Sequence, residues 1–537
     1  MNERSRVLLQ HGISALSDQF KLRLSQLAGS SAIGCLADLG HGIEKESLRV
    51  DPEGHIAKSG HPAGLGSPLT HPSITTDFSE ALLEFITPVF HKPEESLAYL
   101  SDLHTFLFTQ MDREEILWTS SMPCVLDDES QIPLARYGYS NIGKLKTLYR
   151  MGLSHRYGRA MQTIAGIHFN FSLPDSFWAM YRDLQGSSLD QQAFKTEQYF
   201  NLIRNFRRYC WLLLYLFGAS PAVCRSFIRG RKDHGLESYD NGTLYMPYGT
   251  CLRMGDLGYT SNAQSTLFVS YNSLEEYARD LTWAIKTPYE PYQKFGPVDG
   301  KYRQLNDSIL QIENEFYSTI RPKRKSDSGD RPVNILRKEG VEYVEVRCLD
   351  LNPFLPVGID EEEIRFLSSF LICCLLRASP ATDAEERLEL DTNLKLVVNR
   401  GREPGLQLER GGNAISMQEW AREILDDTRE VAQLLDKVNG MDAHVRATDA
   451  QLAKLADPAK TPSAKVLQRM DELGTPYFIF AMNQSLANSD YYRSLRLDDQ
   501  TMTKMKEMVA QSDQERIEIE KEDNVDFDTF LANLNAS

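Results

Sequence analysis

The chain has 537 residues, a formal net charge of −16 at pH 7 and 25% charged residues. This length is enough for two or three average domains, or for one large domain with additions, and it provides a sizeable core. The acidic balance argues against nucleic acid or an anionic membrane as the main partner, because both carry negative charge. A local basic pocket for phosphates is compatible with it.

The cysteines and the apolar segments point to an ordinary intracellular protein. The eight cysteines are scattered without a Cys-x-x-Cys pair, so we expect neither a zinc site nor a disulfide framework. A reducing compartment fits this pattern, and we expect a cytoplasmic protein. Residues 1–27 have the spacing of an amphipathic helix and lack the apolar centre of a signal peptide. The longest apolar run, Tyr209 to Ala219, is about half a membrane span and predicts a buried helix.

The first segment with chemical character is Gly42 to Val50, which has the composition of a strand. Glu44 and Glu46 would share one face of it, because successive strand side chains point to opposite faces. Two neighbouring carboxylates repel each other unless a cation lies between them, and Mg²⁺ is commonly held by carboxylates together with substrate phosphates. The pair is therefore a candidate metal site. The alternative is the solvated face of a half-exposed sheet.

A connection rich in Gly, Pro and His leads from residue 51 to residue 72 and then to the segment Thr75 to Pro88. That segment predicts either a turn followed by a strand or a short helix that ends before Pro88. In the strand interpretation, Asp77 lies at the turn and Glu84 lies among apolar residues, where an ionised carboxylate needs a partner. The alternative places Glu84 in solvent on an edge strand.

A second strand is predicted from Ile167 to Pro174, because apolar and polar residues alternate there. His168 belongs to the polar set. A single histidine on a polar strand face is usually solvated, so His168 has a chemical role only if it converges with the carboxylates. The segment before it, residues 144–161, is basic and aromatic.

A third strand is predicted from Val341 to Asp350, with Glu345 and Arg347 on its polar face. These two residues either belong to a site or form a surface pair of little energetic value. The basic cluster Arg321 to Arg324 precedes this strand. It could meet phosphates or form an ordinary exposed turn.

The chain beyond residue 360 is predicted to be mostly helical, with one clear helix that starts at Met417 and stops at Asn439–Gly440. Residues 511–537 contain eight acidic and two basic residues, which predicts a solvated helix or a disordered end. We accordingly divide the chain into a catalytic core (1–360), a helical remainder packed on it (361–510) and an acidic tail (511–537).

The sequence contains no glycine-based nucleotide motif, so any ATP would have to be positioned by metals held on carboxylates. Several segments in order between about residues 40 and 355 closely resemble the proteobacterial type 1 family of glutamate–cysteine ligases (gamma-glutamylcysteine synthetases). These segments are Gly42–Val50, Ile74–Pro88, Ser120–Cys124, Met161–Ser172, Phe217–Pro221, Asp256–Tyr259, Ile320–Arg324 and Glu345–Arg347.

The resemblance implies an α+β fold of the glutamine-synthetase-like carboxylate–amine ligase type, in which a curved antiparallel sheet forms a funnel surrounded by helices. It also implies a reaction. ATP phosphorylates the gamma-carboxylate of L-glutamate, and the amino group of L-cysteine attacks the acyl phosphate to give gamma-glutamylcysteine, ADP and phosphate, the first step of glutathione biosynthesis. The residues suit this chemistry, because phosphoryl transfer needs cations over the phosphate oxygens.

The resemblance further implies the roles of individual residues. Two or three Mg²⁺ ions would be held by Glu44, Glu46, Asp77, Glu84, His168 and Glu345, although the imidazole suits Mn²⁺ better. Arg347 would meet glutamate or the transferring phosphoryl group with its planar fork. The acceptor pocket would comprise Phe78, Tyr149, Leu153, Gln162, Arg253, Tyr259 and Tyr317, with Arg253 at the cysteine carboxylate. Further phosphate or carboxylate candidates are Arg150, Arg321, Lys323 and Arg324.

Two other functions stay open at this stage. One is a related ligase with a different amine acceptor, since acyl-phosphate chemistry needs only the metal site. The other is a catalytically silent nucleotide-binding or regulatory protein, against which the presence of every metal-ligand candidate argues. Small-molecule substrates are the expected partners, with no nucleic acid or membrane. Feedback inhibition by glutathione is an expectation that comes from the family.

Overall fold

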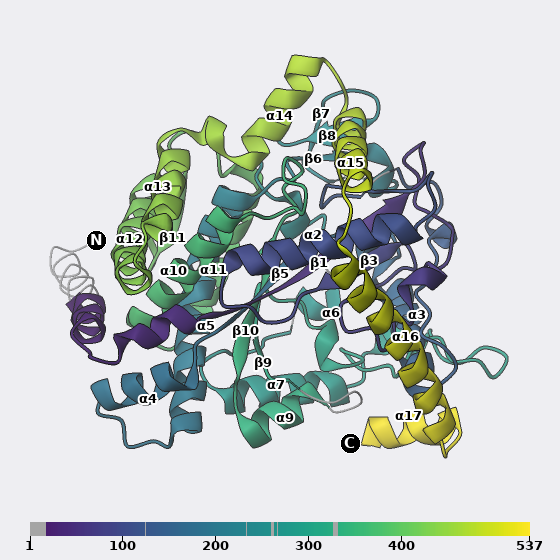
Figure 1. Cartoon of the computed structure of the whole chain (residues 1–537), viewed down its shortest axis with the longest axis horizontal. Helices are drawn as coiled ribbons and strands as arrows, with labels where there is room; N and C mark the ends of the chain where they lie inside the picture. Colours follow the sequence, from purple (N-terminus) through teal and green to yellow (C-terminus); the bar gives the residue numbers. More distant parts are fainter. Residues whose placement is uncertain are drawn as a thin grey trace.

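The computed structural model describes residues 18–123, 125–231, 233–258, 262–265, 267–325 and 331–536. Its main sheet, at the centre of Figure 1, is antiparallel and has the strand order β2-β3-β1-β5-β10-β9, with β4 beside β1. The strands of this sheet are β1 (Gly40–Val50), β2 (Ile74–Thr76), β3 (Leu82–Ile86), β4 (Ile116–Leu117), β5 (Ile167–Ser172), β9 (Ile320–Lys323) and β10 (Tyr343–Leu349). One small sheet contains β6 (Ala222–Cys224), β7 (Glu237–Ser238) and β8 (Thr243–Tyr245). Another contains β11 (Gln407–Arg410) and β12 (Asn413–Ser416).

Helices surround the main sheet (Figure 1). Their bounds are α2 (Pro93–Gln110), α3 (Asn141–Tyr157), α4 (Asp175–Leu184), α5 (Gln191–Phe217), α6 (Asn262–Ser265), α7 (Leu274–Lys286), α8 (Glu290–Gln293), α9 (Pro332–Glu339), α10 (Glu361–Leu376), α11 (Ala384–Arg400), α12 (Met417–Asn439), α13 (Ala443–Ala456), α14 (Pro462–Leu473), α15 (Tyr477–Ser494), α16 (Asp499–Glu522) and α17 (Phe527–Ala536). Residues 18–28 are also helical, which agrees with the predicted first helix in its described part.

Strand β1 lies inside the sheet, between β3 and β5. Its register pairs Glu44 with His168 and Glu46 with Glu84, and β10 pairs Glu345 with Asn170 of β5. Directly opposed residues of neighbouring antiparallel strands place their side chains on the same face. One face of the sheet therefore collects carboxylates from three strands and an imidazole from a fourth.

The opposite face of the sheet belongs to the hydrophobic core. Ile43, Phe85 and Phe169 point there and are fully buried. Helix α2 covers this face, and its His104 stacks on Phe85 with a ring separation of 4.3 Å. Burial of this apolar area, at roughly 25 cal/mol per Å², fixes the orientation of the sheet and so leaves the polar face toward the cavity.

Several predicted elements are confirmed. The segment Thr75 to Pro88 forms β2 and β3 with Asp77 in the turn between them, so the helical alternative is wrong. Helix α12 ends at Asn439 before Gly440, which adopts the left-handed conformation with φ 65°. The basic cluster near residue 321 lies largely in β9 and is not an exposed turn. Beyond residue 360 the hairpin β11–β12 interrupts the otherwise helical chain.

The acidic tail is mostly helical where the structure describes it, in α16 up to Glu522 and in α17 from Phe527. Residue 511 lies inside α16, so the boundary proposed there does not coincide with the end of an element. Ser512 is fully buried, and its hydroxyl accepts a hydrogen bond from the Ser67 backbone N–H at 3.0 Å. Leu531 of α17 is only 3% exposed. The tail therefore contributes buried residues, and the solvated-helix description applies to part of its surface only.

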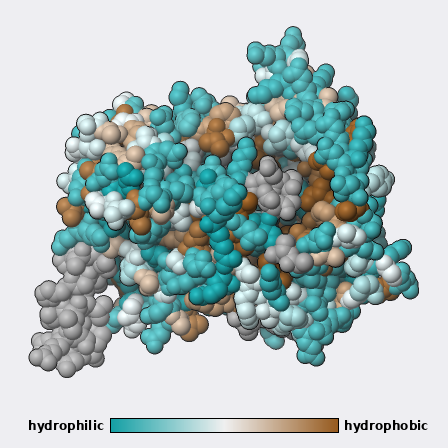
Figure 2. Space-filling view, turned by 90° about the horizontal axis from the view of Figure 1, so that it is seen from below, coloured by the Kyte–Doolittle hydropathy of each residue, from teal (hydrophilic) through white to brown (hydrophobic). Residues whose placement is uncertain are grey.

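The outer surface is mixed in character. The face in Figure 2 is mainly hydrophilic, and its hydrophobic residues form separate patches. Among the described helices, none combines the length and the hydropathy needed to cross a membrane.

Candidate active site

A cavity of about 540 Å³ lies against the polar face of the sheet. Its wall includes residues of β1, β3, β5, β9, β10 and α3 together with loop residues. The predicted site residues that line it are Glu44, Glu46, Asp77, Glu84, Tyr149, Arg150, Leu153, Gln162, His168, Arg253, Tyr317, Arg321, Lys323, Glu345 and Arg347. The fold thus brings together side chains from segments that lie far apart in the sequence.

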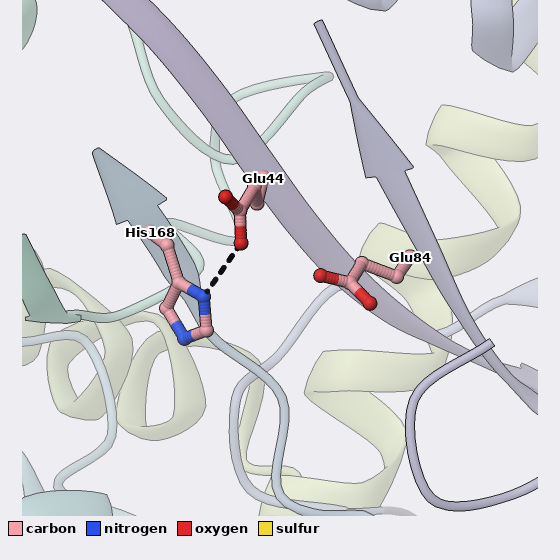
Figure 3. Close-up of side chains that lie close together, drawn as sticks. All are labelled: Glu44, Glu84 and His168. Carbon is pink, nitrogen blue, oxygen red and sulfur yellow. Dashed lines mark hydrogen bonds and ion pairs between the residues drawn. The ribbon is translucent and has the colours of Figure 1, made fainter. Parts of the chain in front are cut away.

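Glu44, Glu84 and His168 form the centre of the acidic group. Figure 3 shows them pointing toward one space from three strands, and one ligand atom from each lies within 4.8 Å of the others. The Glu44 carboxylate is 3.2 Å from Nδ1 of His168, and its other oxygen accepts a hydrogen bond of 2.9 Å from the Asn170 amide. A donor set of carboxylates and one imidazole fits Mg²⁺, and it fits Mn²⁺ better because of the imidazole nitrogen.

Glu46 and Asp77 extend this group. Glu46 has one oxygen 3.8 Å from Nε2 of His168, and its other oxygen accepts the Gly166 backbone N–H at 2.8 Å. Asp77 is half-buried on the turn, 3.9 Å from the Arg150 guanidinium. The Asp77 backbone carbonyl also accepts a hydrogen bond from Arg150. These contacts fix the backbone and side chains around the acidic cluster.

Electrostatic crowding is strongest at Glu84. Burial, followed by the negative charges of Glu44, Asp77 and Glu46, raises the pKa of Glu84 well above its usual range. Burial also raises the pKa of Glu46. A divalent cation bound among these crowded carboxylates would relieve their mutual repulsion, because it supplies positive charge next to them.

Glu345 is held ionised by the basic side of the cavity. Its side chain is 1% exposed, and its two oxygens lie 2.9 Å from Nη1 of Arg347 and 3.6 Å from Nζ of Lys323. Burial opposes ionisation, but the charges of Arg347 and Lys323 outweigh it and lower the pKa of Glu345 well below its usual range. The Nε of Arg347 is buried and has no hydrogen-bond partner among the described residues. Arg347 can therefore still donate to an oxyanion bound in the cavity.

Strand alternation separates the three basic candidates of β9 and its end. Arg321 and Lys323 line the cavity, and Arg321 is 8% exposed. Arg324 points elsewhere: its Nε donates to the Glu339 carboxylate at 2.9 Å and its Nη1 donates to the Glu339 carbonyl at 2.6 Å. The structure therefore brings two of these cations to the cavity and ties the third to α9.

The predicted acceptor residues are placed unevenly. Arg253 lines the cavity but is 3% exposed, and its Nε lies 3.0 Å from the fully buried carboxylate of Asp350. It also donates to the carbonyls of Arg347 and Leu349. Phe78 is buried beside the cavity and is not part of its lining. Tyr259 lies outside the described residues.

The cavity contains residues that the sequence did not single out. Lys146 lines it from α3, within the basic and aromatic segment already noticed, and burial together with the Arg150 charge lowers its pKa to about 8. Asn170 is not part of the cavity lining but donates to the Glu44 carboxylate from the polar face of β5, which it shares with His168, so strand alternation could have found it. Leu534 lines the cavity from α17, and no local pattern in the sequence indicates this.

The sequence profile described as glutamate-cysteine ligase matches residues 24–397. The chain belongs to the glutamate–cysteine ligase family. It is 50% identical over 523 residues to the glutamate–cysteine ligase of Pseudomonas aeruginosa strain LESB58, covering 97% of this chain and 99% of that one. The enzyme of the same name from Pseudomonas putida is 48% identical with the same coverage.

Solved structures of similar proteins agree with this family membership. The glutamate–cysteine ligase of Francisella tularensis in complex with AMP has a TM-score of 0.87 and 35% identity, covering 93% of this chain and 98% of that one. A bifunctional glutathione synthetase from Pasteurella multocida has a TM-score of 0.67 and 25% identity, covering 86% of this chain and 54% of that one. The expected carboxylate–amine ligase fold with an open, curved antiparallel sheet is thereby confirmed.

Proposed function

We propose that this chain joins the gamma-carboxylate of L-glutamate to the amino group of L-cysteine through a gamma-glutamyl phosphate, with conversion of ATP to ADP and phosphate, and so carries out the first step of glutathione biosynthesis. The observation that carries the residue assignments is the convergence of six predicted metal ligands with Arg347 in one cavity. Family membership supplies the reaction, and the cavity supplies the groups that it needs.

The acidic side of the cavity is proposed to hold the divalent cations. Glu44, Glu84 and His168 form its centre, with Glu46, Asp77 and Glu345 around them. Bound Mg²⁺ would neutralise the phosphate oxygens of ATP during transfer of the gamma-phosphoryl group. The number of ions, two or three, belongs to the same proposal.

The basic side of the cavity is proposed to orient the reacting oxygens. Arg347 can donate from its buried Nε to the gamma-carboxylate of glutamate or to the transferring phosphoryl group. Arg321 and Lys323 lie on the same wall and suit the phosphates, with Arg150 as a further candidate. Each oxyanion would thus be met by a cation that is already fixed by the strands, which lowers the cost of reorganisation during the reaction.

The acceptor side is proposed to bind cysteine. Arg253 would pair with the cysteine carboxylate, and the buried Asp350 holds its guanidinium in place. The pocket around it comprises Tyr149, Leu153, Gln162 and Tyr317, and the assignment of Phe78 and Tyr259 to it stays a prediction. Glutathione contains the same gamma-glutamyl and cysteinyl groups as the product, so we assign its feedback inhibition to this cavity as well.

Substitution of the acidic residues tests the proposal. Glu44→Gln or Glu345→Gln removes one negative charge at nearly constant volume, so we expect loss of at least one cation and a fall in kcat of about a hundredfold. Phosphate release that depends on both glutamate and cysteine measures the activity, and metal content measured after dialysis reports the binding. Glu53→Gln, at an exposed position, is the matched control. Full activity of either site variant at limiting Mg²⁺ would contradict the assignment.

A further inference from the structure

Asp77, a proposed metal ligand, follows β2 at the open edge of the main sheet. Strand β2 is the last strand of the sheet and pairs with β3, and the Asp77 N–H donates to the Leu82 carbonyl at 3.0 Å. Backbone groups alternate in direction along a strand, so the carbonyl of Thr76 points away from β3. A buried carbonyl at the edge of a sheet needs a donor from outside the sheet. The position of Asp77 therefore depends on the groups that meet this edge.

Tyr137 meets the edge with its hydroxyl. The O–H donates to the Thr76 carbonyl at 2.6 Å and lies 3.0 Å from the Asp77 carbonyl, and its oxygen accepts from the Thr76 hydroxyl at 3.1 Å. Tyr137 is 1% exposed, so water does not compete for these contacts. One buried phenol thus contacts the carbonyl before Asp77 and the carbonyl of Asp77 itself.

Helix α3 fixes the ring of Tyr137. The Cζ atom of Arg150 lies 4.5 Å from the ring centroid, and Nζ of Lys146 lies 5.3 Å from it. Cations at these distances are attracted to the face of an aromatic ring. The Arg150 guanidinium also donates to the Asp77 carbonyl and lies 3.5 Å from the Thr76 carbonyl. Tyr137 therefore links α3, which forms one wall of the cavity, to the turn that carries Asp77.

The segment before the tyrosine holds the rest of this turn. The N–H of Ala135 donates to the Phe78 carbonyl at 3.0 Å, and the Pro133 carbonyl accepts the Glu80 N–H at 3.2 Å. These bonds attach the segment to the turn at two further points. The backbone of the turn is thus fixed beyond the ligand, and the tyrosine hydroxyl fixes it at the ligand.

We propose that Tyr137 is a positioning residue for the metal site, whose hydroxyl sets the place of the Asp77 carboxylate beside the acidic group. The inference rests on the proposed function for the role of Asp77 as a ligand. The carboxylates of β1, β3 and β10 stand on strands with a neighbour on each side, and the hydrogen bonds of the sheet hold them. Asp77 lies at the edge without a second neighbouring strand, and Tyr137 supplies the contact that such a strand would make.

A change of one atom in the full chain tests the inference. Tyr137→Phe removes the hydroxyl and keeps the ring over which the two cations lie. Tyr139→Phe, the same change at a residue that is 82% exposed, is the matched control. Partners that orient a metal ligand typically contribute about ten- to hundredfold to metal affinity, and Arg150 keeps part of the contact, so we expect Tyr137→Phe to raise the Kd for Mn²⁺ about tenfold. Electron paramagnetic resonance of free Mn²⁺ measures this Kd without any substrate.

A double-mutant cycle shows whether the effect passes through Asp77. Asp77→Asn should weaken the binding of the same ion, and Tyr137→Phe in that background should change the Kd further by less than about twofold. Activity provides a second measurement. Excess Mg²⁺ should restore the kcat of Tyr137→Phe, whereas a general defect in the fold would not respond to the metal.

A folded Tyr137→Phe variant with the Mn²⁺ affinity of the original chain would overturn the inference, as would an equal loss of affinity with and without the Asp77 carboxylate. Either result leaves the proposed function intact. Absence of Mn²⁺ binding by the original chain, alone or with ADP, would overturn both. If Tyr137→Phe does not fold, Thr76→Val replaces it, because it removes the hydroxyl that donates to Tyr137 and should raise the Kd for Mn²⁺ about threefold. An unchanged Kd in that variant overturns the inference.

Discussion

Gly166 lies between Glu46, a proposed metal ligand, and Arg253, the residue proposed to bind the cysteine carboxylate. Its N–H donates to the Glu46 carboxylate at 2.8 Å, and its carbonyl accepts the Glu46 backbone N–H at 3.0 Å. A Cβ atom at this position would lie 2.8 Å from the Cζ of Arg253. The missing side chain therefore lets the Arg253 guanidinium pack directly against the chain that anchors a proposed metal ligand.

Gly166→Ala should displace Arg253 and so weaken the binding of cysteine. Because charged groups must be positioned to within a fraction of an ångström, we expect the KM for cysteine to rise about tenfold, with a smaller change for ATP. Steady-state kinetics that vary each substrate in turn provide the measurement. Gly60→Ala is the control, since a Cβ atom there would meet nothing within 4 Å. A defect that falls chiefly on ATP would show that Arg253 serves a different ligand.

Direct removal of Arg253 is a less clear test. Asp350 is 2% exposed, and its carboxylate also accepts from the Ser220 hydroxyl at 2.6 Å and the Ala219 N–H at 2.8 Å. Loss of one partner of a buried ion pair typically costs about 3–5 kcal/mol, because the other charge stays buried. An Arg253→Ala variant would therefore combine a stability defect with any effect on substrate.

At the scale of elements, alternation in β1, β5 and β10 made most of the metal group predictable. A period of two assigns Glu44 and Glu46 to one face of β1, and His168 and Glu345 to the polar faces of their own strands. That these faces coincide follows from the pairing of the strands in the structure. Lys45 shows the limit of this reasoning. Its Nζ lies 2.7 Å from the imidazole of His104 in α2, and burial lowers its pKa to about 7. The strand pattern predicts the face on which Lys45 lies, but only tertiary packing determines which helix covers it.

His41 at the start of β1 should make stability depend on pH. It is 3% exposed, its Nε2 lies 3.0 Å from the Ser368 hydroxyl, and burial lowers its pKa to about 3. The unfolded chain binds a proton at this residue below about pH 6.5, whereas the folded chain does not. The contribution of His41 to the free energy of unfolding therefore falls as pH decreases from about 6.5 toward 4, by up to about 1.4 kcal/mol per pH unit.

His41→Gln removes this titration and provides the measurement. Urea unfolding of both proteins between pH 7 and pH 4.5 should show the variant gaining relative to the original chain as the pH falls. A difference between the two unfolding free energies that is the same at every pH would contradict the prediction. The part of the difference that does not change with pH comes from the packing of the two side chains and does not affect the test.

At the scale of the whole molecule, the cavity joins residues that range from Glu44 to Leu534. The carboxylates of the strands and His168 could be predicted because their motifs combine strand alternation with polar chemistry. Arg331, which precedes α9, and Leu534 of α17 could not, because their local sequence fits many packings. The contacts of α17 depend on shape and on the position of α3, which only the assembled fold determines.

Ligand binding should stabilise the whole chain. A ligand that binds only the folded state adds RT ln(1 + [L]/Kd), about 2.7 kcal/mol at a hundredfold excess over Kd. We therefore expect ADP with Mg²⁺ to raise the Tm, and EDTA to remove most of this increase because the phosphates then meet the acidic group without a cation. Differential scanning calorimetry with and without EDTA is the measurement. An increase that EDTA leaves unchanged would show that nucleotide binding does not depend on the metal site.

The distance along the chain between β1 and α17 has a consequence for biosynthesis. Ribosomes add about 5–20 residues per second, so on the order of half a minute or more separates the emergence of Glu44 from that of Leu534. During this interval β3, β5 and β10 are made one after another, and α17, which places Leu534 in the cavity wall, is made after all of them. A growing chain therefore cannot hold the complete cavity until α17 has left the ribosome.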